Sequence, residues 1–179
     1  MENKSIDTSI TESKTVIEMI TVANEFCLFT EEHEKYEMDF ILSYLQRVLP
    51  LLYIKGSLLP DTESESGNDD ERYVIEETWE YLFNSFVKVF GKNNTYYFWD
   101  AGLKEPVETT VAENLADMYQ DLRDFVFLYS KPTYYAKLNA VNMCKELFLS
   151  HWGKLIPPLL SHIHGIIMDK KPSFDEYDV

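Results

Sequence analysis

The sequence is poor in glycine, cysteine and positive charge, and it contains no long hydrophobic run. Only 6 glycines and 2 cysteines occur among 179 residues. No Gly-x-Ser-x-Gly or phosphate-loop pattern is present, which excludes the recognisable nucleophile and nucleotide motifs. No apolar stretch approaches the roughly 20 residues that span a bilayer, and the first residues do not resemble a secretory signal. We therefore expect a cytoplasmic protein without a catalytic motif.

Basic residues are few, with 16 Lys and Arg against 31 Asp and Glu, for a formal net charge of −15. Residues 1–129 hold 26 acidic and 10 basic groups, whereas residues 130–179 hold 5 and 6. Affinity for DNA or RNA rests largely on Lys and Arg that neutralise phosphates, so most of this chain would repel a polyanion. The same argument disfavours an anionic membrane surface. We expect no direct binding to nucleic acid or to membranes.

The two cysteines, Cys27 and Cys144, each lie within an apolar helical pattern. Free cysteine is among the most buried residue types, and disulfides are rare in cytoplasmic proteins. Two buried thiols are therefore favoured over the alternative, a single disulfide.

Helical periodicity is the strongest pattern in the chain, and it is clearest in residues 111–129. There, apolar residues recur at alternating spacings of four and three, which keeps side chains on one face of a helix. Similar patterns predict helices near residues 11–30, 38–60, 75–90, 134–152 and 155–168, with a kink or restart at Pro50 and a break at Gly153. Because no strand alternation is convincing, we predict an all-α fold: a single-domain bundle of about six helices with helices 11–30 and 111–129 at its centre. The apolar seam of residues 111–129 consists of Val111, Leu115, Met118, Leu122, Phe125 and Tyr129.

The segments outside these helices have polar or aromatic compositions. Residues 1–10 are predicted to be a flexible leader and residues 169–179 a flexible tail, on either side of a helical domain at 11–168. Residues 61–72 contain six carboxylates and no apolar residue, and their spacing does not match a calcium-binding loop, so a solubilising loop is favoured. Residues 92–106 are predicted to be a turn-rich connector whose aromatic residues, 96–99, cover an edge of the core rather than stack on a ligand.

Acidic residues of the 111–129 helix are the most obvious candidates for a metal site. Glu113, Asp117, Asp121 and Asp124 are spaced four and three apart, and bundles of four helices can hold metals with such carboxylates. However, most of them lie opposite the apolar seam, where charge usually faces water. None of the four histidines follows a Glu by three residues, as the dinuclear bundles require. We favour a solvated acidic face and expect no metal and no cofactor.

Four segments occur in a fixed order: VANEFCLF at 22–29, VLPLLYIKGSLLP at 48–60, VAENLADMYQDLRDFVFLY at 111–129 and CKELFLSHWGKLIPPLLSHIH at 144–164. With these segments the chain resembles DUF5063, a family of uncharacterised proteins found mainly in Bacteroides and relatives. The resemblance implies a cytoplasmic bacterial protein of about this length. It implies no catalytic activity, because none is assigned to the family.

The segments that carry the resemblance also include polar positions. The side chains at these polar positions either form a binding surface between helices 11–30 and 111–129 or connect these two helices by hydrogen bonds. We favour the second interpretation. The candidate binding surface consists of Asn24, Glu25, Glu113, Asp117, Gln120, Asp121 and Asp124.

These patterns lead to two hypotheses about function. The first is a non-enzymatic domain that binds a protein partner through the acidic face of the 111–129 helix or through the acidic loop. The second is an enzyme or small-ligand-binding protein with a pocket between helices, lined by Glu25 and Asp121 with His151. The second hypothesis requires these side chains to meet in one cleft. By itself, His151 is expected to be a structural or surface histidine.

Overall fold

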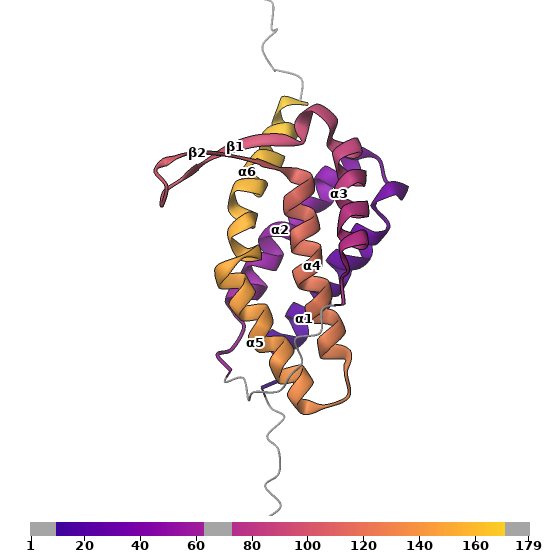
Figure 1. Cartoon of the computed structure of the whole chain (residues 1–179), viewed down its shortest axis with the longest axis vertical. Helices are drawn as coiled ribbons and strands as arrows, with labels where there is room; N and C mark the ends of the chain where they lie inside the picture. Colours follow the sequence, from indigo (N-terminus) through magenta and orange to yellow (C-terminus); the bar gives the residue numbers. More distant parts are fainter. Residues whose placement is uncertain (1–9, 63–72, 171–179) are drawn as a thin grey trace, which may run out of the picture.

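The computed structural model describes residues 10–62 and 73–170, which form six α-helices and one β-hairpin (Figure 1). The predicted single, predominantly helical domain is confirmed. Residues 1–9 of the expected leader, residues 63–72 of the acidic loop and residues 171–179 of the expected tail lie outside the described residues. The helices are α1 (Lys14–Glu31), α2 (Met38–Ser57), α3 (Glu76–Phe90), α4 (Val111–Ser130), α5 (Tyr134–Ser150) and α6 (Trp152–Asp169), with 3-10 turns η1 (His33–Lys35) and η2 (Gly91–Asn93) and strands β1 (Thr95–Asp100) and β2 (Glu105–Thr110).

Helix α4 is the centre of the fold, where it packs against α1, α3, α5 and α6 (Figure 1). It begins after Thr110, whose hydroxyl oxygen accepts a hydrogen bond from the backbone N–H of Glu113 at 3.1 Å, as an N-cap residue does. The predicted seam is buried from Val111 to Phe125. The face opposite the seam is also largely covered, because neighbours surround the helix on several sides.

Helix α1 is less central than predicted. It packs against α2 and α4, and it buries Phe26 and Cys27 completely, but Ile17 and Leu28 are each 44% exposed on its outer face. Its nearly continuous apolar surface therefore does not indicate a helix enclosed on all sides. Cys27 and Cys144 are both buried free thiols, as predicted.

Helix α2 continues through Pro50 and does not restart there. A proline inside a helix costs about 3 kcal/mol because it removes a backbone hydrogen bond and clashes with the preceding turn. Val48, Leu49 and Leu52 are buried immediately around the proline. We attribute the continuity of α2 to this packing, which offsets the cost of the proline.

The break between α5 and α6 lies at His151, which has φ −135° and ψ −93°, and not at Gly153. Helix α6 therefore starts at Trp152, earlier than predicted, and Pro157 and Pro158 fall in its second turn. Gly153 is buried at the start of α6, where a Cβ atom would overlap the backbone carbonyl of Phe148. This glycine allows the two helices to meet closely rather than ending either of them.

Residues 95–110 form an antiparallel hairpin instead of the predicted turn-rich connector. Strand β1 pairs with β2 from Thr95–Thr110 to Asp100–Glu105, and the hairpin extends away from the helices in Figure 1. Alternate residues of β1 face the bundle: Tyr96 is buried and stacks on His162 of α6, with ring centroids 4.5 Å apart. The expected packing of this aromatic segment on the core is confirmed for Tyr96, whereas Tyr97 and Trp99 are each 66% exposed.

Candidate functional site

Polar side chains of α4 connect it to most of its neighbours. Asn114 donates from Nδ2 to the Tyr96 hydroxyl at 2.6 Å and so holds the hairpin against the bundle. Towards α1, Tyr119 donates its hydroxyl hydrogen to Glu31 at 2.8 Å. Burial raises the pKa of both tyrosines, so these hydroxyls stay protonated and keep their hydrogen bonds. These two contacts connect α4 to β1 and to α1, and neither involves a residue of the predicted binding surface.

Asp124 does not face water, contrary to the prediction of a solvated acidic face. Its side chain is 6% exposed, and its Oδ1 atom accepts hydrogen bonds from the backbone N–H groups of Tyr73 and Val74 at 2.9 Å each. These two residues precede α3, so the carboxylate fixes the chain where it enters that helix. The prediction failed because α3 and its leading segment cover this side of α4, and a buried carboxylate is stable there when it accepts hydrogen bonds.

Asp121 is also buried, at 5% exposure, and it therefore does not belong to a solvent-facing surface either. Its Oδ2 atom lies 2.6 Å from Nδ1 of His151, at the junction of α5 and α6. The Nε2 atom of the same imidazole lies 3.8 Å from the Asp117 carboxylate, one helical turn earlier on α4. His151 thus sits between two carboxylates with 43% of its side chain exposed.

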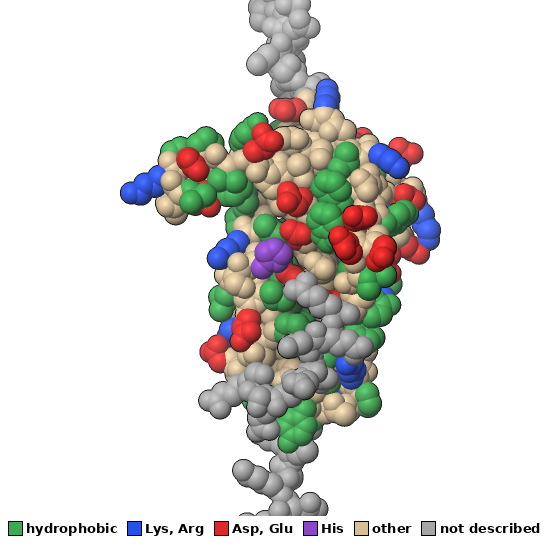
Figure 2. All heavy atoms as spheres, viewed as in Figure 1, with side chains coloured by type: hydrophobic (Ala, Val, Ile, Leu, Met, Phe, Trp, Pro, Cys, Tyr) green, Lys and Arg blue, Asp and Glu red, His purple; other side chains and the backbone are tan. Residues whose placement is uncertain are grey.

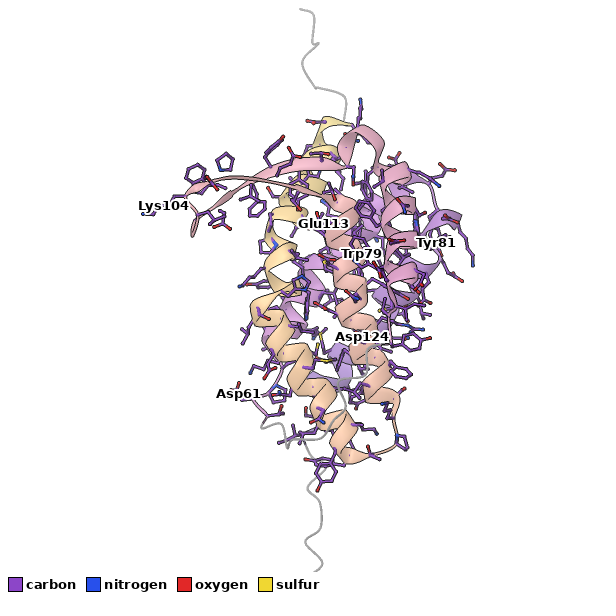
Figure 3. All side chains as sticks on the ribbon, viewed as in Figure 1. Asp61, Trp79, Tyr81, Lys104, Glu113 and Asp124 are labelled. Carbon is purple, nitrogen blue, oxygen red and sulfur yellow. The ribbon has the colours of Figure 1, made fainter. Side chains whose placement is uncertain are left out.

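Asp117 holds the indole of Trp79 on α3. The indole Nε1–H donates to Asp117 Oδ1 at 2.8 Å, and the Trp79 ring stacks on Phe83, with centroids 5.2 Å apart and planes 8° apart. Both rings are partly exposed. Figure 3 shows Trp79 on the side of α3 towards α4, with Glu113 near the beginning of α4. The stack is therefore a fixed aromatic surface at the junction of the two helices.

Carboxylates flank this aromatic stack on both helices. On α3, Glu76 and Glu80 lie on the same side as Phe83 because the three residues are spaced four and three apart, and both glutamates are exposed. On α4, Glu113 is exposed and Asp117 is 25% exposed. Figure 2 shows hydrophobic side chains between acidic side chains of both helices in this region. We call this surface the acidic–aromatic strip, defined as Glu76, Trp79, Glu80, Phe83, Glu113 and Asp117.

The predicted binding surface is only partly assembled. Glu25 lines a groove of about 290 Å³ between α1 and α2, away from the α4 residues that face α3, α5 and α6. Asn24 and Gln120 are half-buried, on α1 and α4 respectively. The aromatic half of the strip could not be predicted from the sequence. Trp79 and Asp117 are 38 positions apart, and the helical pattern around one residue does not indicate contact with the other.

The described part of the chain contains neither a cluster of metal ligands nor a membrane-spanning helix. Across residues 10–62 and 73–170, no three His, Cys, Asp or Glu side chains are grouped to hold a metal ion. None of the helices in these ranges is both long and apolar enough to cross a membrane. Burial raises the pKa of the Cys27 and Cys144 thiols, so both thiols are protonated and unreactive in the folded protein.

Comparison with known proteins identifies a family. Residues 10–169 match the model of DUF5063, a domain of unknown function. The crystal structure of protein BF1032 from Bacteroides fragilis is similar to this chain, with 29% sequence identity and a TM-score of 0.81; the match covers 91% of this chain and 98% of that chain. No curated protein matches. Because the family match extends over almost all of the helical domain, the chain belongs to the DUF5063 family.

Proposed function

We propose that this protein is a non-enzymatic binding domain that recognises a Lys- or Arg-containing segment of a partner protein at the acidic–aromatic strip. The observation that carries the proposal is the stack of Trp79 on Phe83 between carboxylates of two helices. An aromatic face attracts a cation by about 0.5–1 kcal/mol at an exposed site, and tryptophan does so best. Carboxylates beside the ring add ion pairs and select against acidic segments.

The strip is prepared for such a ligand before binding. The hydrogen bond to Asp117 fixes the orientation of the Trp79 ring, so little side-chain freedom is lost when a ligand settles on it. Within the described residues, no Lys or Arg forms an ion pair with Glu76, Glu80 or Glu113. The net charge of −15 also accelerates the approach of a basic partner. We further propose that the protein acts in the cytoplasm, where its two free thiols stay reduced.

A titration with an unstructured Arg-Gly repeat peptide tests the proposal, with fluorescence anisotropy as the readout. The variant Glu80→Lys/Glu113→Lys reverses two charges on the strip, and we expect it to weaken binding by at least about tenfold. Trp79→Leu leaves the net charge unchanged and removes the aromatic face. We expect it to weaken binding about two- to fivefold, the equivalent of one exposed cation–π contact.

The matched control is Glu12→Lys/Glu105→Lys, which makes the same change in net charge at exposed positions outside the strip. This control should change affinity by less than about twofold at physiological salt, where distant charges are screened. Equal losses in the two double variants would show that the peptide responds only to overall charge. That result, or unchanged binding by Trp79→Leu, would contradict the proposal.

A second candidate function, binding or turnover of a small ligand, is favoured by the geometry of His151. An imidazole held by one carboxylate at 2.6 Å and directed at another at 3.8 Å is the type of arrangement that moves protons. The contacts of His151 with Asp117 and Asp121 support this candidate. Glu25, which the second hypothesis from the sequence included, does not support it, because Glu25 lines the groove between α1 and α2. Screening small anionic and neutral fragments by the NMR signals of the His151 ring tests this candidate; unchanged signals throughout the screen would count against it.

A further inference from the structure

Helix α2 is apolar around almost its whole circumference. Its inner face is buried in the core, through residues that include Ile41, Leu45 and Leu52. Its outer face is also apolar: Phe40, Leu51 and Ile54 are 53%, 41% and 52% exposed, and Leu58, which directly follows the last residue of the helix, is 52% exposed. Exposed apolar residues gathered on one face of a protein are typical of a protein–protein contact surface. In Figure 1, α1 and α2 lie behind α4, away from the acidic–aromatic strip. The outer face of α2 is thus a second surface, separate from the strip.

The outer residues of α2 follow the pattern of a coiled-coil seam. Positions 40, 44, 47, 51, 54 and 58 are separated by four, three, four, three and four residues, the alternation of a and d positions in a heptad repeat. We call this set the α2 seam. It consists of Phe40, Tyr44, Arg47, Leu51, Ile54 and Leu58.

The spacings between successive residues of the α2 seam are the same when they are counted from either end of the helix. When two copies of α2 lie antiparallel across a twofold axis, each seam residue therefore meets another seam residue. Such self-complementarity is the requirement for an interface between identical subunits. The facing pairs are Phe40 with Leu58, Tyr44 with Ile54, and Arg47 with Leu51, each made twice.

Charges beside the seam are also complementary to themselves. Glu25 and Arg47 line the groove of about 290 Å³ between α1 and α2, together with Phe40, Tyr44 and Leu51. Because both charges border the same groove near the middle of the seam, a twofold axis there brings Glu25 of each copy towards Arg47 of the partner subunit. No ion pair within the described part of the chain involves either residue.

Ion pairs within the chain limit the electrostatic repulsion between two copies at this surface. The chain carries a net charge of −15, but two carboxylates near the seam, Glu18 and Asp39, are each paired with lysine. Lys55 lies 2.7 Å from Glu18, and Lys14 lies 3.8 Å from the same glutamate. Lys170 similarly pairs with Asp39 beside the beginning of the seam.

From the periodicity, exposure and charges of the α2 seam, we propose that a second copy of this chain docks on it. The two copies form a twofold symmetric dimer in which their α2 helices lie antiparallel. This interface is independent of the acidic–aromatic strip, so either proposal can fail without the other. Sedimentation equilibrium of the full chain measures the assembly directly. We expect a species of twice the 21.0 kDa chain mass.

The variant Leu51→Glu/Ile54→Glu places charges in the middle of the seam. Because both residues are exposed in a single chain, the helical content should be unchanged by circular dichroism. The dimer dissociation constant should rise at least about 100-fold, because the interface would bury unpaired carboxylates. The control Leu149→Glu alters a residue that is 61% exposed on α5, and it should leave the dissociation constant unchanged.

Exchange of the two charges tests the symmetry of the interface. Glu25→Arg and Arg47→Glu should each weaken the dimer, and the double variant Glu25→Arg/Arg47→Glu should restore it, since the facing charges are again opposite. A wild-type chain that remains monomeric up to about 100 μM, where a micromolar interface is well populated, would overturn the proposal and assign the seam to a different protein. A dimer that persists in Leu51→Glu/Ile54→Glu, or a double variant that does not recover, would also overturn it.

Discussion

The carboxylate of Asp124 in α4 accepts a hydrogen bond at 2.9 Å from the backbone N–H of Val74, which lies 50 positions earlier in the chain. The same oxygen accepts the N–H of Tyr73. Asp124 and Val74 are buried, whereas Tyr73 is 46% exposed. Asp124→Ala therefore leaves the Val74 N–H without an acceptor, and we expect it to lower the free energy of unfolding by about 1–3 kcal/mol. Asp124→Asn keeps an oxygen in the same place and should lose less than half as much. Urea denaturation measures both values; equal losses would show that the charge, and not the hydrogen bonding, stabilises the fold.

Two glycines in α6 should respond in opposite directions to replacement by alanine. At Gly153 a Cβ atom would overlap the carbonyl oxygen of Phe148, a backbone atom that cannot move aside. We expect Gly153→Ala to destabilise the protein by about 3 kcal/mol or more. Gly165 has no neighbouring atom within 4 Å of the same position, so Gly165→Ala should stabilise the helix by about 0.5–1 kcal/mol. Thermal unfolding of the two variants checks the pair, and a stable Gly153→Ala protein would refute the close approach of α5 and α6.

The bounds of α4 could be predicted from the sequence, but the burial of its polar face could not. The seam from Val111 to Phe125 is as predicted, because periodicity reports which residues share a face. Periodicity does not report how many neighbours surround a helix. Asp121 and Asp124 are buried because α3, α5 and α6 cover the face that would be exposed in a helix with a single neighbour.

The hairpin and the candidate site were missed for different reasons. The aromatic residues of β1 and the threonines at the end of β2 favour strands, and this composition was the available signal, although the segments are short. The acidic–aromatic strip depends on the contact between Trp79 and Asp117 across two helices. No local pattern encodes that contact, so sequence reasoning found the carboxylates of α4 but not the aromatic surface beside them.

Neighbouring tyrosines of β1 should differ in their contribution to stability. The Tyr96 hydroxyl accepts a hydrogen bond from Asn114 in a buried setting, so Tyr96→Phe leaves a buried amide donor unsatisfied and should cost about 1–2 kcal/mol. The Tyr97 hydroxyl bonds Glu108 at the surface, where water replaces the lost partner. Tyr97→Phe should therefore change the free energy of unfolding by less than about 0.5 kcal/mol. Similar losses in both variants would contradict the burial of the hairpin base.

The two cysteines should make stability depend on alkaline pH. Burial raises the pKa of Cys27 and Cys144 above the ordinary value of 9.0, because the thiolate is disfavoured in the core. The unfolded chain then loses these protons first, so stability is complete below pH 9 and falls as the pH rises above it. The urea midpoint should decrease above pH 9. At pH 8 a thiol reagent should label neither cysteine in the native protein and both in urea; rapid labelling of the native protein would contradict their burial.

The three tryptophans allow the proposed cation site to be observed directly. Trp79 donates its indole N–H to Asp117 in the strip, Trp152 is fully buried, and Trp99 is exposed on the hairpin. Their indole N–H signals in a two-dimensional NMR spectrum therefore report on three separate places. A Trp79→Phe variant assigns the first signal.

The most direct measurement is a titration of the full chain with the Arg-Gly repeat peptide, followed through these indole signals, with a Glu-Gly peptide as control. We expect the Trp79 signal to shift with the Arg-Gly peptide, the Trp99 and Trp152 signals to stay in place, and the Glu-Gly peptide to have no effect. A stationary Trp79 signal, or shifts confined to Trp99, would contradict binding at the acidic–aromatic strip.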